Sequence, residues 1–415
     1  MGIAKRSLLA AATLASASAL VLGAGAGTAS ANYLGLCGGR TLAPAIDGQG
    51  ATFQRAAQGF WNPGFTSGVC SGIAVSYAST GSGAGLRAWG SDAAGGTPAA
   101  SGNEFVATDD APNATQLANI KRAANGADVV VMPSVQGAIA IVYTLPASCT
   151  ITGTITNAQL EATFRGNNPS WSSLPGATGA GCSTPIRYVV RNDSSGTTYQ
   201  FKHYLFAING AAVSGASTWR DLQEINASRP TPNQTWPSTS AAPIVPTATG
   251  GGAVAAEVAR TPGSIGYVSL SDAGALATFS VQNRTLPSVT FASPRSGSNA
   301  NCANATYNVP AVGGRHVNVD WSNTYGGNPN IGGTIYPICT LTFEVGLAGA
   351  TPATSGTAGY TTAGFANGDS VASDVRDYFN YVNSNTPSNL GYAALPNTVG
   401  SPVLAAARSA AAEVW

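Results

Sequence analysis

Hydrophobic positions follow two different periods along this chain. Short runs rich in apolar and β-branched residues predict strands at residues 71–79, 127–135, 137–146 and 186–191. Other segments can place their apolar residues along one face of a helix, and these are residues 52–61, 85–90, 114–124, 156–166 and 196–208. Strands that alternate with helices are typical of α/β proteins with parallel sheets, so we expect that fold class.

Stretches rich in Gly, Ser, Thr and Pro separate these elements. They predict loops at 167–184, 229–252 and 285–335, and the sequence shows no internal repeat. With 415 residues, the chain is longer than one hydrophobic core normally accommodates. We therefore expect two lobes.

The first residues predict an export signal. Basic residues precede an apolar run over 8–22, and a small-x-small triplet ends at Ala31, where we expect cleavage. No later stretch is apolar over the roughly 18 residues that a membrane span needs. The sequence therefore predicts a secreted or periplasmic protein whose mature chain has no transmembrane segment.

Cysteine usage fits this location. An even number of cysteines in an exported chain favours disulfides, and the lack of CxxC pairs argues against a metal site. Six cysteines allow 15 pairings. Of these we expect the sequential one, which closes three local loops: Cys37 with Cys70, Cys149 with Cys182, and Cys302 with Cys339. Cys37 does not fit a lipid-attachment motif, because bulky Leu36 stands where a small residue is needed.

Charge is sparse. Only 9% of the residues are charged and the formal net charge is +1, which argues against a nucleic-acid partner because such proteins carry basic patches. Against this background the stretch RNDSSGTTYQF, residues 191–201, stands out, since it combines Arg191 and Asp193 with serines and threonines. The simplest alternative is that these two charges form a solvated surface pair.

Three predicted strand-to-helix joints share one chemistry. Residues 48–53, 79–85 and 192–198 each bring glycine and hydroxyl residues to a predicted helix start. A helix N-terminus offers unpaired N–H donors and a partial positive charge, and glycine lets the backbone approach a ligand. Each joint alone could simply be a helix cap, because Ser, Thr and Gly are common there. Three such joints and an arginine together indicate an anion site.

Five motifs, three of which contain these joints, resemble the PstS-type phosphate-binding proteins, the receptors of bacterial phosphate ABC importers, and the related DING-type proteins. In chain order they are GQGATF, VSYASTGSGAGL, FVATDDAP, VVRNDSSGTTYQFKHYL and GGAVAAEVARTPGSIGYVS. The resemblance spans residues 46–415 and also includes LGYAALPNTV near the end of the chain.

The resemblance implies a two-lobed periplasmic-binding-protein fold of the Venus flytrap type (type II), with a hinge between the lobes. It implies four segments: a signal peptide at 1–31, the first part of lobe 1 at 32–139, lobe 2 at 140–335, and the second part of lobe 1 at 336–415. Inorganic phosphate would lie between the lobes, with no metal and no cofactor.

The matching motif positions imply a phosphate-binding set. Its members are Thr52, Phe53, Ser82, Asp109, Arg191, Asp193, Ser195, Gly196 and Thr197. In this reading Arg191 is the charged donor, Asp193 holds its guanidinium, and the residues from Ser195 onward form an anion-binding helix start. Ser194 departs from the family, which usually has glycine there.

The implied carboxylate has a chemical reason. Phosphate near neutral pH keeps at least one proton, so it can donate a hydrogen bond to Asp109. Sulfate has none to give and would be repelled, which leaves a buried acceptor unpaired. Because FVATDDAP has two adjacent aspartates, Asp110 remains an alternative acceptor.

Three function classes follow. The first is a monomeric binding protein that delivers phosphate to an ABC permease and ATPase complex. The second is a secreted oxyanion-binding protein with a sensing, adhesin or matrix role. The third, an enzyme, is disfavoured because only His203 and His316 are available as histidine bases and no GxSxG or HExxH motif occurs.

Overall fold

The computed structural model describes most of the chain. The described residues are 37, 43, 45–209, 212–214, 217–219, 233–237, 248–284, 288–296, 302–324, 335–349 and 357–415. The predicted signal segment and its cleavage point after Ala31 lie outside them.

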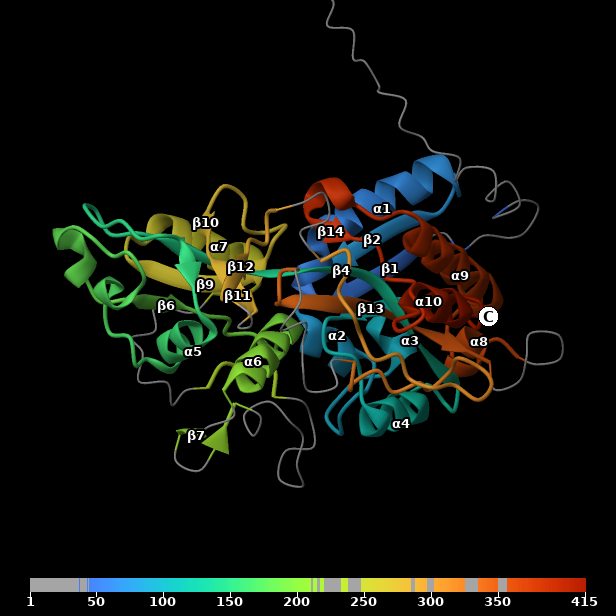
Figure 1. The fold of residues 1–415 in the computed structure, drawn as a ribbon. Coiled ribbons are helices and arrows are strands. Elements are labelled where there is room, and N and C mark those ends of the chain that lie inside the picture. Colours follow the sequence, from blue (N-terminus) through green and yellow to red (C-terminus); the bar gives the residue numbers. More distant parts are fainter. Residues whose placement is uncertain are drawn as a thin grey trace, which may run out of the picture. The chain divides into compact units, whose positions relative to one another are not determined.

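Nine of the described strands form one sheet (Figure 1), in the order β2-β1-β3-β13-β4-β9-β6, with β10 and β14 also paired to β4. The bounds along this path are β2 (Ala74–Ala78), β1 (Ala45–Gly50), β3 (Phe105–Thr108), β13 (Cys339–Ala348), β4 (Asp128–Thr144), β9 (Ser264–Ser269) and β6 (Arg187–Val189). The expected α/β class is confirmed. The expected parallel sheet is wrong in its centre, because β13 runs antiparallel to both β3 and β4, and β4 runs antiparallel to β9.

Two predicted strands, 127–135 and 137–146, are one continuous strand, β4. Up to Ala138 this strand pairs with β13, and from Ile139 onward it pairs with β9. Gly137 lies inside this strand and leaves room for the Phe53 ring, because a Cβ at this position would lie 3.0 Å from that ring. One buried strand therefore carries the chain from one half of the sheet into the other.

A β-bulge interrupts the pairing of β4 with β13. Pro133 faces Phe343 and Val135 faces Thr342, so Ser134 is the extra residue on β4. Proline has no N–H for the ladder, which is why it is tolerated at a bulge. The Ser134 hydroxyl compensates by donating to the Thr342 carbonyl at 3.0 Å.

Helices form at all five predicted places. The bounds of the described helices are η2 (Thr52–Gln54), α1 (Arg55–Gly68), α2 (Ser82–Ala88), α3 (Pro98–Ser101), α4 (Ala114–Ala123), α5 (Asn157–Arg165), η3 (Trp171–Ser173), η4 (Ala180–Ser183), α6 (Gly196–Ile208), α7 (Gly251–Arg260), α8 (Gly359–Ala363), α9 (Gly368–Ser384), η5 (Ser388–Leu390) and α10 (Val403–Ala411). Asn113 and Thr156 each begin a helix with a reciprocal capping box, which satisfies otherwise unpaired N–H groups.

Short strands complete the described elements. They are β5 (Thr154–Ile155), β7 (Ala212–Ser214), β8 (Ser217–Thr218), β10 (Ala277–Thr278), β11 (Ser280–Arg284), β12 (Thr290–Ala292) and β14 (Tyr392–Ala393). Strands β12, β11 and β5 form a small sheet of their own, and β7 pairs with β8.

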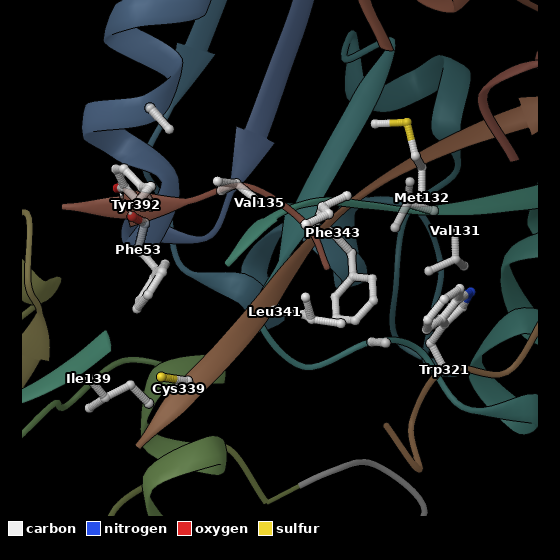
Figure 2. Close-up of a cluster of buried hydrophobic side chains, with 14 of the residues drawn as sticks. Phe53, Val131, Met132, Val135, Ile139, Trp321, Cys339, Leu341, Phe343 and Tyr392 are labelled. Atoms are coloured by element: carbon white, nitrogen blue, oxygen red, sulfur yellow. Dashed lines mark hydrogen bonds between the residues drawn. The ribbon is translucent and has the colours of Figure 1, made fainter. Parts of the chain in front are cut away.

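The hydrophobic core follows the two long central strands. Figure 2 shows Leu341 and Phe343 on β13, with the Trp321 ring 5.9 Å from that of Phe343. Phe53 and Tyr392 meet edge to face at 6.0 Å. Because side chains alternate along a strand, the residues between these apolar positions point to the opposite face of β13.

Cross-links and contacts tie distant segments to this core. The expected sequential pairing of all six cysteines is confirmed: Cys37–Cys70, Cys149–Cys182 and Cys302–Cys339. The segment 302–324 contacts β4 through Asn318, whose side chain accepts from the Val129 N–H at 2.9 Å. The lobe boundaries at 139/140 and 335/336 remain a prediction. Within the described residues, the helices are too short or too polar to cross a bilayer.

Replacing Cys302 and Cys339 together by serine is expected to lower the free energy of unfolding by about 2 to 4 kcal/mol, because the unfolded chain regains conformational freedom. Equilibrium urea unfolding of the variant and the wild type measures this difference. An unchanged free energy of unfolding would show that the bond contributes nothing to stability.

Candidate functional site

The predicted site residues lie where strands end and helices begin. Thr52 and Phe53 follow β1, Ser82 begins α2 after β2, and Asp109 follows β3. On the other half of the sheet, β6 leads through Arg191 and Asp193 to Ser195, which caps α6 by accepting from the Thr198 N–H at 3.1 Å. Each predicted glycine- and hydroxyl-rich joint therefore does begin a helix.

These joints converge. A Cβ built on Gly196, at the start of α6, would lie 2.6 Å from Ser82 Oγ and 2.9 Å from Asp109 Cβ. Thr52 Oγ1 accepts from the Gly251 N–H at 3.3 Å, which joins the first joint to the start of α7. Both halves of the sheet thus contribute to one cluster of backbone and hydroxyl groups.

Gly81 is required at its position. Its φ of 99° lies in the left-handed region, and a Cβ there would come within 2.8 Å of the Asp193 carboxylate. A side chain at this position would therefore push the second joint away from the third.

Arg191 and Asp193 form a buried ion pair. The Arg191 Nε donates to Asp193 Oδ1 at 2.6 Å, Nη2 donates to Oδ2, and the Gly250 N–H donates to Oδ1 at 3.2 Å. Arg191 is only 3% exposed, so the alternative of a solvated surface pair is wrong. Burial opposes ionisation of Asp193, but the bonds from Arg191 outweigh it and lower the pKa of Asp193.

Asp109 receives hydroxyl hydrogens on both carboxylate oxygens. Thr197 donates to Oδ2 at 2.9 Å and Thr342 donates to Oδ1 at 3.0 Å. The Asp109 N–H donates to Ser82 Oγ at 3.2 Å, which leaves the Ser82 hydroxyl hydrogen for another acceptor. Burial raises the pKa of Asp109 to about 6, although the two hydroxyl bonds and nearby Arg191 oppose this rise.

The neighbouring carboxylate has different surroundings. Asp110 Oδ2 accepts from the Gln234 side-chain Nε2 at 2.9 Å. The main-chain carbonyl of Gln234 accepts from the Ser195 N–H at 3.0 Å. Burial, together with the negative charge of Asp109, raises the pKa of Asp110 to about 7, although the bond from Gln234 opposes this rise. Of the two adjacent aspartates, Asp109 is the one whose side chain lies against the start of α6 and beside Arg191.

Some contributors were missed from the sequence. Gly251 begins a quoted motif and Gly250 directly precedes it, and both follow the same rule of glycine at a helix start, so they could have been found. Thr342 carried no such signal, because it reaches Asp109 from a strand more than two hundred residues later in the chain. Gln234 likewise comes from a predicted loop.

The two histidines lie on different segments. His203 lies on α6 and lines a small cavity with Gln200 and Cys339. The His316 N–H donates to Glu413 at 3.2 Å. Among the described residues, the only group with metal-ligand spacing is Cys37, Cys70 and Asp377, whose two sulfurs are already joined in a disulfide.

Comparisons with known proteins place the chain in a family. A family model described as a PBP superfamily domain matches residues 44–313, more than half of the chain. Alkaline phosphatase L of Pseudomonas aeruginosa is 30% identical over 234 residues, which are 55% of this chain and 59% of that protein. The chain therefore spans less than two thirds of the length of this curated relative.

Solved structures share the fold. A DING protein matches with a TM-score of 0.59 and 22% identity, covering 88% of this chain and 93% of that one. A high-affinity periplasmic phosphate-binding protein, solved with phosphate at pH 8.5, matches with a TM-score of 0.56 and 20% identity over the same shares. The expected two-lobed α/β fold of the periplasmic binding proteins is confirmed.

Asp110→Asn is expected to stabilise the protein at pH 8 but not at pH 4. A carboxyl whose pKa is raised by folding binds more protons in the folded state, so its contribution to stability is lost as the pH rises from about 4 to about 7. Asparagine removes this loss and can still accept from Gln234, so we expect a gain on the order of 2 kcal/mol. Urea unfolding at pH 4, 6 and 8 measures it.

The matched control is Asp92→Asn, at a partly exposed carboxylate that accepts from the Ala94 N–H. An Asp110→Asn variant with the wild-type pH dependence would contradict the raised pKa of Asp110.

Proposed function

This chain belongs to the PBP superfamily, and on that premise we propose that it is an extracytoplasmic binding protein that captures inorganic phosphate between its two lobes. The single observation that supports this most is the buried cluster in which the start of α6 lies against Ser82 and Asp109, while Gly81 and Gly250 lie against Asp193, the partner of Arg191. The names of the phosphate-binding relatives point the same way.

In this proposal, donors on several elements bind the anion. Arg191 donates charge-assisted bonds, and Asp193 holds its guanidinium in a fixed orientation. The starts of α2 and α6 supply N–H groups and hydroxyls, which suit a tetrahedral oxyanion. The remaining donors are Thr52, the backbone of Phe53, Ser82, Ser195, Gly196 and Thr197.

Asp109 is the selectivity element. As an ionised carboxylate it accepts a hydrogen bond from the proton that phosphate keeps near neutral pH. Sulfate has no proton with which to donate such a bond. The unpaired, repelled contact would cost about 1 to 3 kcal/mol or more. We assign this role to Asp109 and not to Asp110, because the Asp109 side chain lies against Gly196 at the start of α6, whereas the Asp110 side chain meets Gln234.

The strength of such a site needs no metal. Charge-assisted hydrogen bonds contribute about 1.5 to 3 kcal/mol each. Several of them, after the cost of association, reach the roughly −8 kcal/mol of a micromolar site.

Lobe motion accompanies binding. Thr197 from the half that contains β6 donates to Asp109 from the half that contains β3, so the arrangement described here is a closed one. A buried anion can enter only if the halves separate, and we propose that the hinge lies in β4, which pairs with β13 in one half and with β9 in the other. We propose lobe 1 at 32–139 and 336–415, and lobe 2 at 140–335.

Three disulfides fit an oxidising compartment outside the cytoplasm. Delivery to an ABC permease and ATPase complex is the role we propose for a monomeric receptor, after removal of a signal peptide at Ala31. A secreted oxyanion-binding protein with a sensing, adhesin or matrix role is the alternative. Growth on limiting phosphate after deletion of the gene distinguishes them, because only the transport role predicts a phosphate-dependent growth defect.

Arg191→Ala is expected to weaken phosphate binding by about 2 to 4 kcal/mol, because it removes the charged donor and leaves Asp193 buried without its partner. Isothermal titration calorimetry with phosphate, sulfate and arsenate measures it. The control is Arg165→Ala, which breaks a comparable helix ion pair with Glu161 in another part of the chain. Unchanged phosphate affinity in Arg191→Ala would remove Arg191 from the site.

Asp109→Asn is expected to reduce the preference for phosphate over sulfate more than it reduces phosphate affinity, because asparagine can donate to either anion. The same titrations measure both quantities. If the wild type binds sulfate as tightly as phosphate, the acceptor role of Asp109 is wrong.

The name of the curated relative requires a direct test of hydrolysis. We expect purified protein to bind phosphate without turning over a generic phosphomonoester such as p-nitrophenyl phosphate at pH 7 to 10. Arg191→Ala distinguishes intrinsic turnover from a contaminant: activity that copurifies with the wild type and is lost in this variant would contradict a purely binding role.

A further inference from the structure

A buried row of amide side chains connects Asp109 to the interior behind the site. Gln54 and Gln58 follow each other along η2 and α1, and both are at most 1% exposed. They face Thr342 and Glu344 on β13. Four residues of a helix advance by about 6 Å, and two residues of a strand advance by about 6.8 Å. The spacing from Gln54 to Gln58 therefore matches the spacing from Thr342 to Glu344.

The backbone fixes the orientation of the first amide. Gln54 Nε2 lies 3.2 Å from the Phe343 carbonyl oxygen, which can only accept. The nitrogen of Gln54 must therefore face β13, and its oxygen must face away, where it accepts from Gln58 Nε2 at 3.0 Å. Gln58 in turn accepts from the Tyr378 hydroxyl at 2.7 Å. The direction of the whole row follows from one carbonyl group.

This direction excludes Gln54 as an acceptor of the Thr342 hydroxyl hydrogen. Gln54 Nε2 donates to Thr342 Oγ1 at 2.7 Å, and an amide nitrogen cannot accept in return. The Thr342 hydroxyl must therefore give its own hydrogen elsewhere. Its two acceptors are Asp109 Oδ1 at 3.0 Å and the Thr108 carbonyl at 3.2 Å.

We propose that Gln54, supported by Gln58, is a specificity-determining positioning residue: it holds the Thr342 hydroxyl hydrogen on Asp109 and thereby keeps Asp109 an ionised acceptor. The inference rests on the proposed phosphate site, because it concerns which oxyanion that site prefers. Sulfate can be accommodated only when Asp109 is protonated and donates to it. Each hydroxyl bond that favours the ionised carboxylate therefore also excludes sulfate.

The buried carboxyl of Glu344 ends the row of amides. Glu344 is fully buried, and burial raises its pKa well above the usual range, which favours the neutral carboxyl. Its Oε1 accepts from Gln58 Nε2 at 2.8 Å. The row therefore favours no second negative charge behind Asp109, and its contacts are hydrogen bonds between side chains.

Other charged and titratable groups interact electrostatically with Asp109, and none of them is substituted in these variants. They are Arg191, Asp110, Asp272, Tyr77 and Tyr392. A change caused by Thr342 or Gln54 can therefore be measured as a difference from the wild type.

The test compares Thr342→Val, which keeps the shape and loses the hydroxyl, with Thr342→Ser, which keeps the hydroxyl. The Asp109 carboxyl is followed by carbon-13 NMR titration of ligand-free protein, with Asp109→Asn to assign its signal. In Thr342→Val we expect the protonated fraction of Asp109 at pH 7.5 to rise about tenfold, the effect of losing one bond of about 1.4 kcal/mol. Thr342→Ser should restore the wild-type titration.

Gln54→Met tests the orienting role itself, because Thr342 keeps its hydroxyl and regains the freedom to turn away. We expect a change in the same direction as in Thr342→Val but smaller. The control is Gln136→Met, which removes an equally buried amide whose partners are the Ala394 carbonyl and the Tyr307 hydroxyl. Calorimetric titration at pH 7.5 should show the ratio of phosphate to sulfate affinity falling about threefold to tenfold in the two site variants and not in the control.

The outcomes separate the two ideas. An unchanged titration of Asp109 in both Thr342→Val and Gln54→Met overturns the orienting role. A shifted titration with an unchanged affinity ratio overturns the role in selectivity. A wild type that does not bind phosphate overturns the proposed function and the selectivity role with it, while the ligand-free titration still decides whether Gln54 directs the Thr342 hydrogen. If Gln54→Met does not fold, the valine and serine variants at 342 still decide whether this hydroxyl acts on Asp109.

Discussion

The antiparallel pairing of β4 with β13 positions the other strands of the large sheet whose ends lead into the candidate site. Strand β3 pairs with β13, β1 with β3, β9 with β4, and β6 with β9, so each binding-site joint is positioned through this central pair. A shift of one residue in its register would turn Thr342 to the other face of the sheet and away from Asp109. The bulge at Ser134 makes such a shift costly, because Ser134 compensates for the N–H that Pro133 lacks.

Buried charge imposes the second constraint. A guanidinium that is 3% exposed is tolerated only when it is paired and hydrogen-bonded, and Asp193 meets this need with two bonds from Arg191. Asp109 and Asp110 are buried beside it, and burial raises the pKa of both. Such a combination of one fixed cation and carboxyls that titrate near neutral pH is typical of a functional site, whereas a structural core would use apolar residues.

The two faces of β13 differ in chemistry, because one face is apolar and the other, behind the site, is polar. On one face of β13, Leu341 and Phe343 pack among aromatic and aliphatic side chains (Figure 2), which stabilises the fold through burial. On the other face, Thr342 and Glu344 meet the amides of Gln54 and Gln58. One strand therefore joins stability and ligand chemistry through its alternation of side chains.

The sequence by itself determined the elements and the candidate chemistry, because both depend on local signals. Periodicity predicted α6 at 196–208, and cysteine order predicted the disulfides. The glycine- and hydroxyl-rich joints indicated an anion site, and the family resemblance pointed to Ser82, Arg191 and Gly196. The sequence did not predict that the runs at 127–135 and 137–146 are one continuous strand, β4. Only the tertiary structure brought Thr342 and Gln234 to the two aspartates, since contacts between residues far apart in the chain leave no local pattern. It also decided that Asp109 lies beside Arg191 while Asp110 turns to Gln234, because two adjacent residues point in different directions and only the surrounding fold selects which one faces the site.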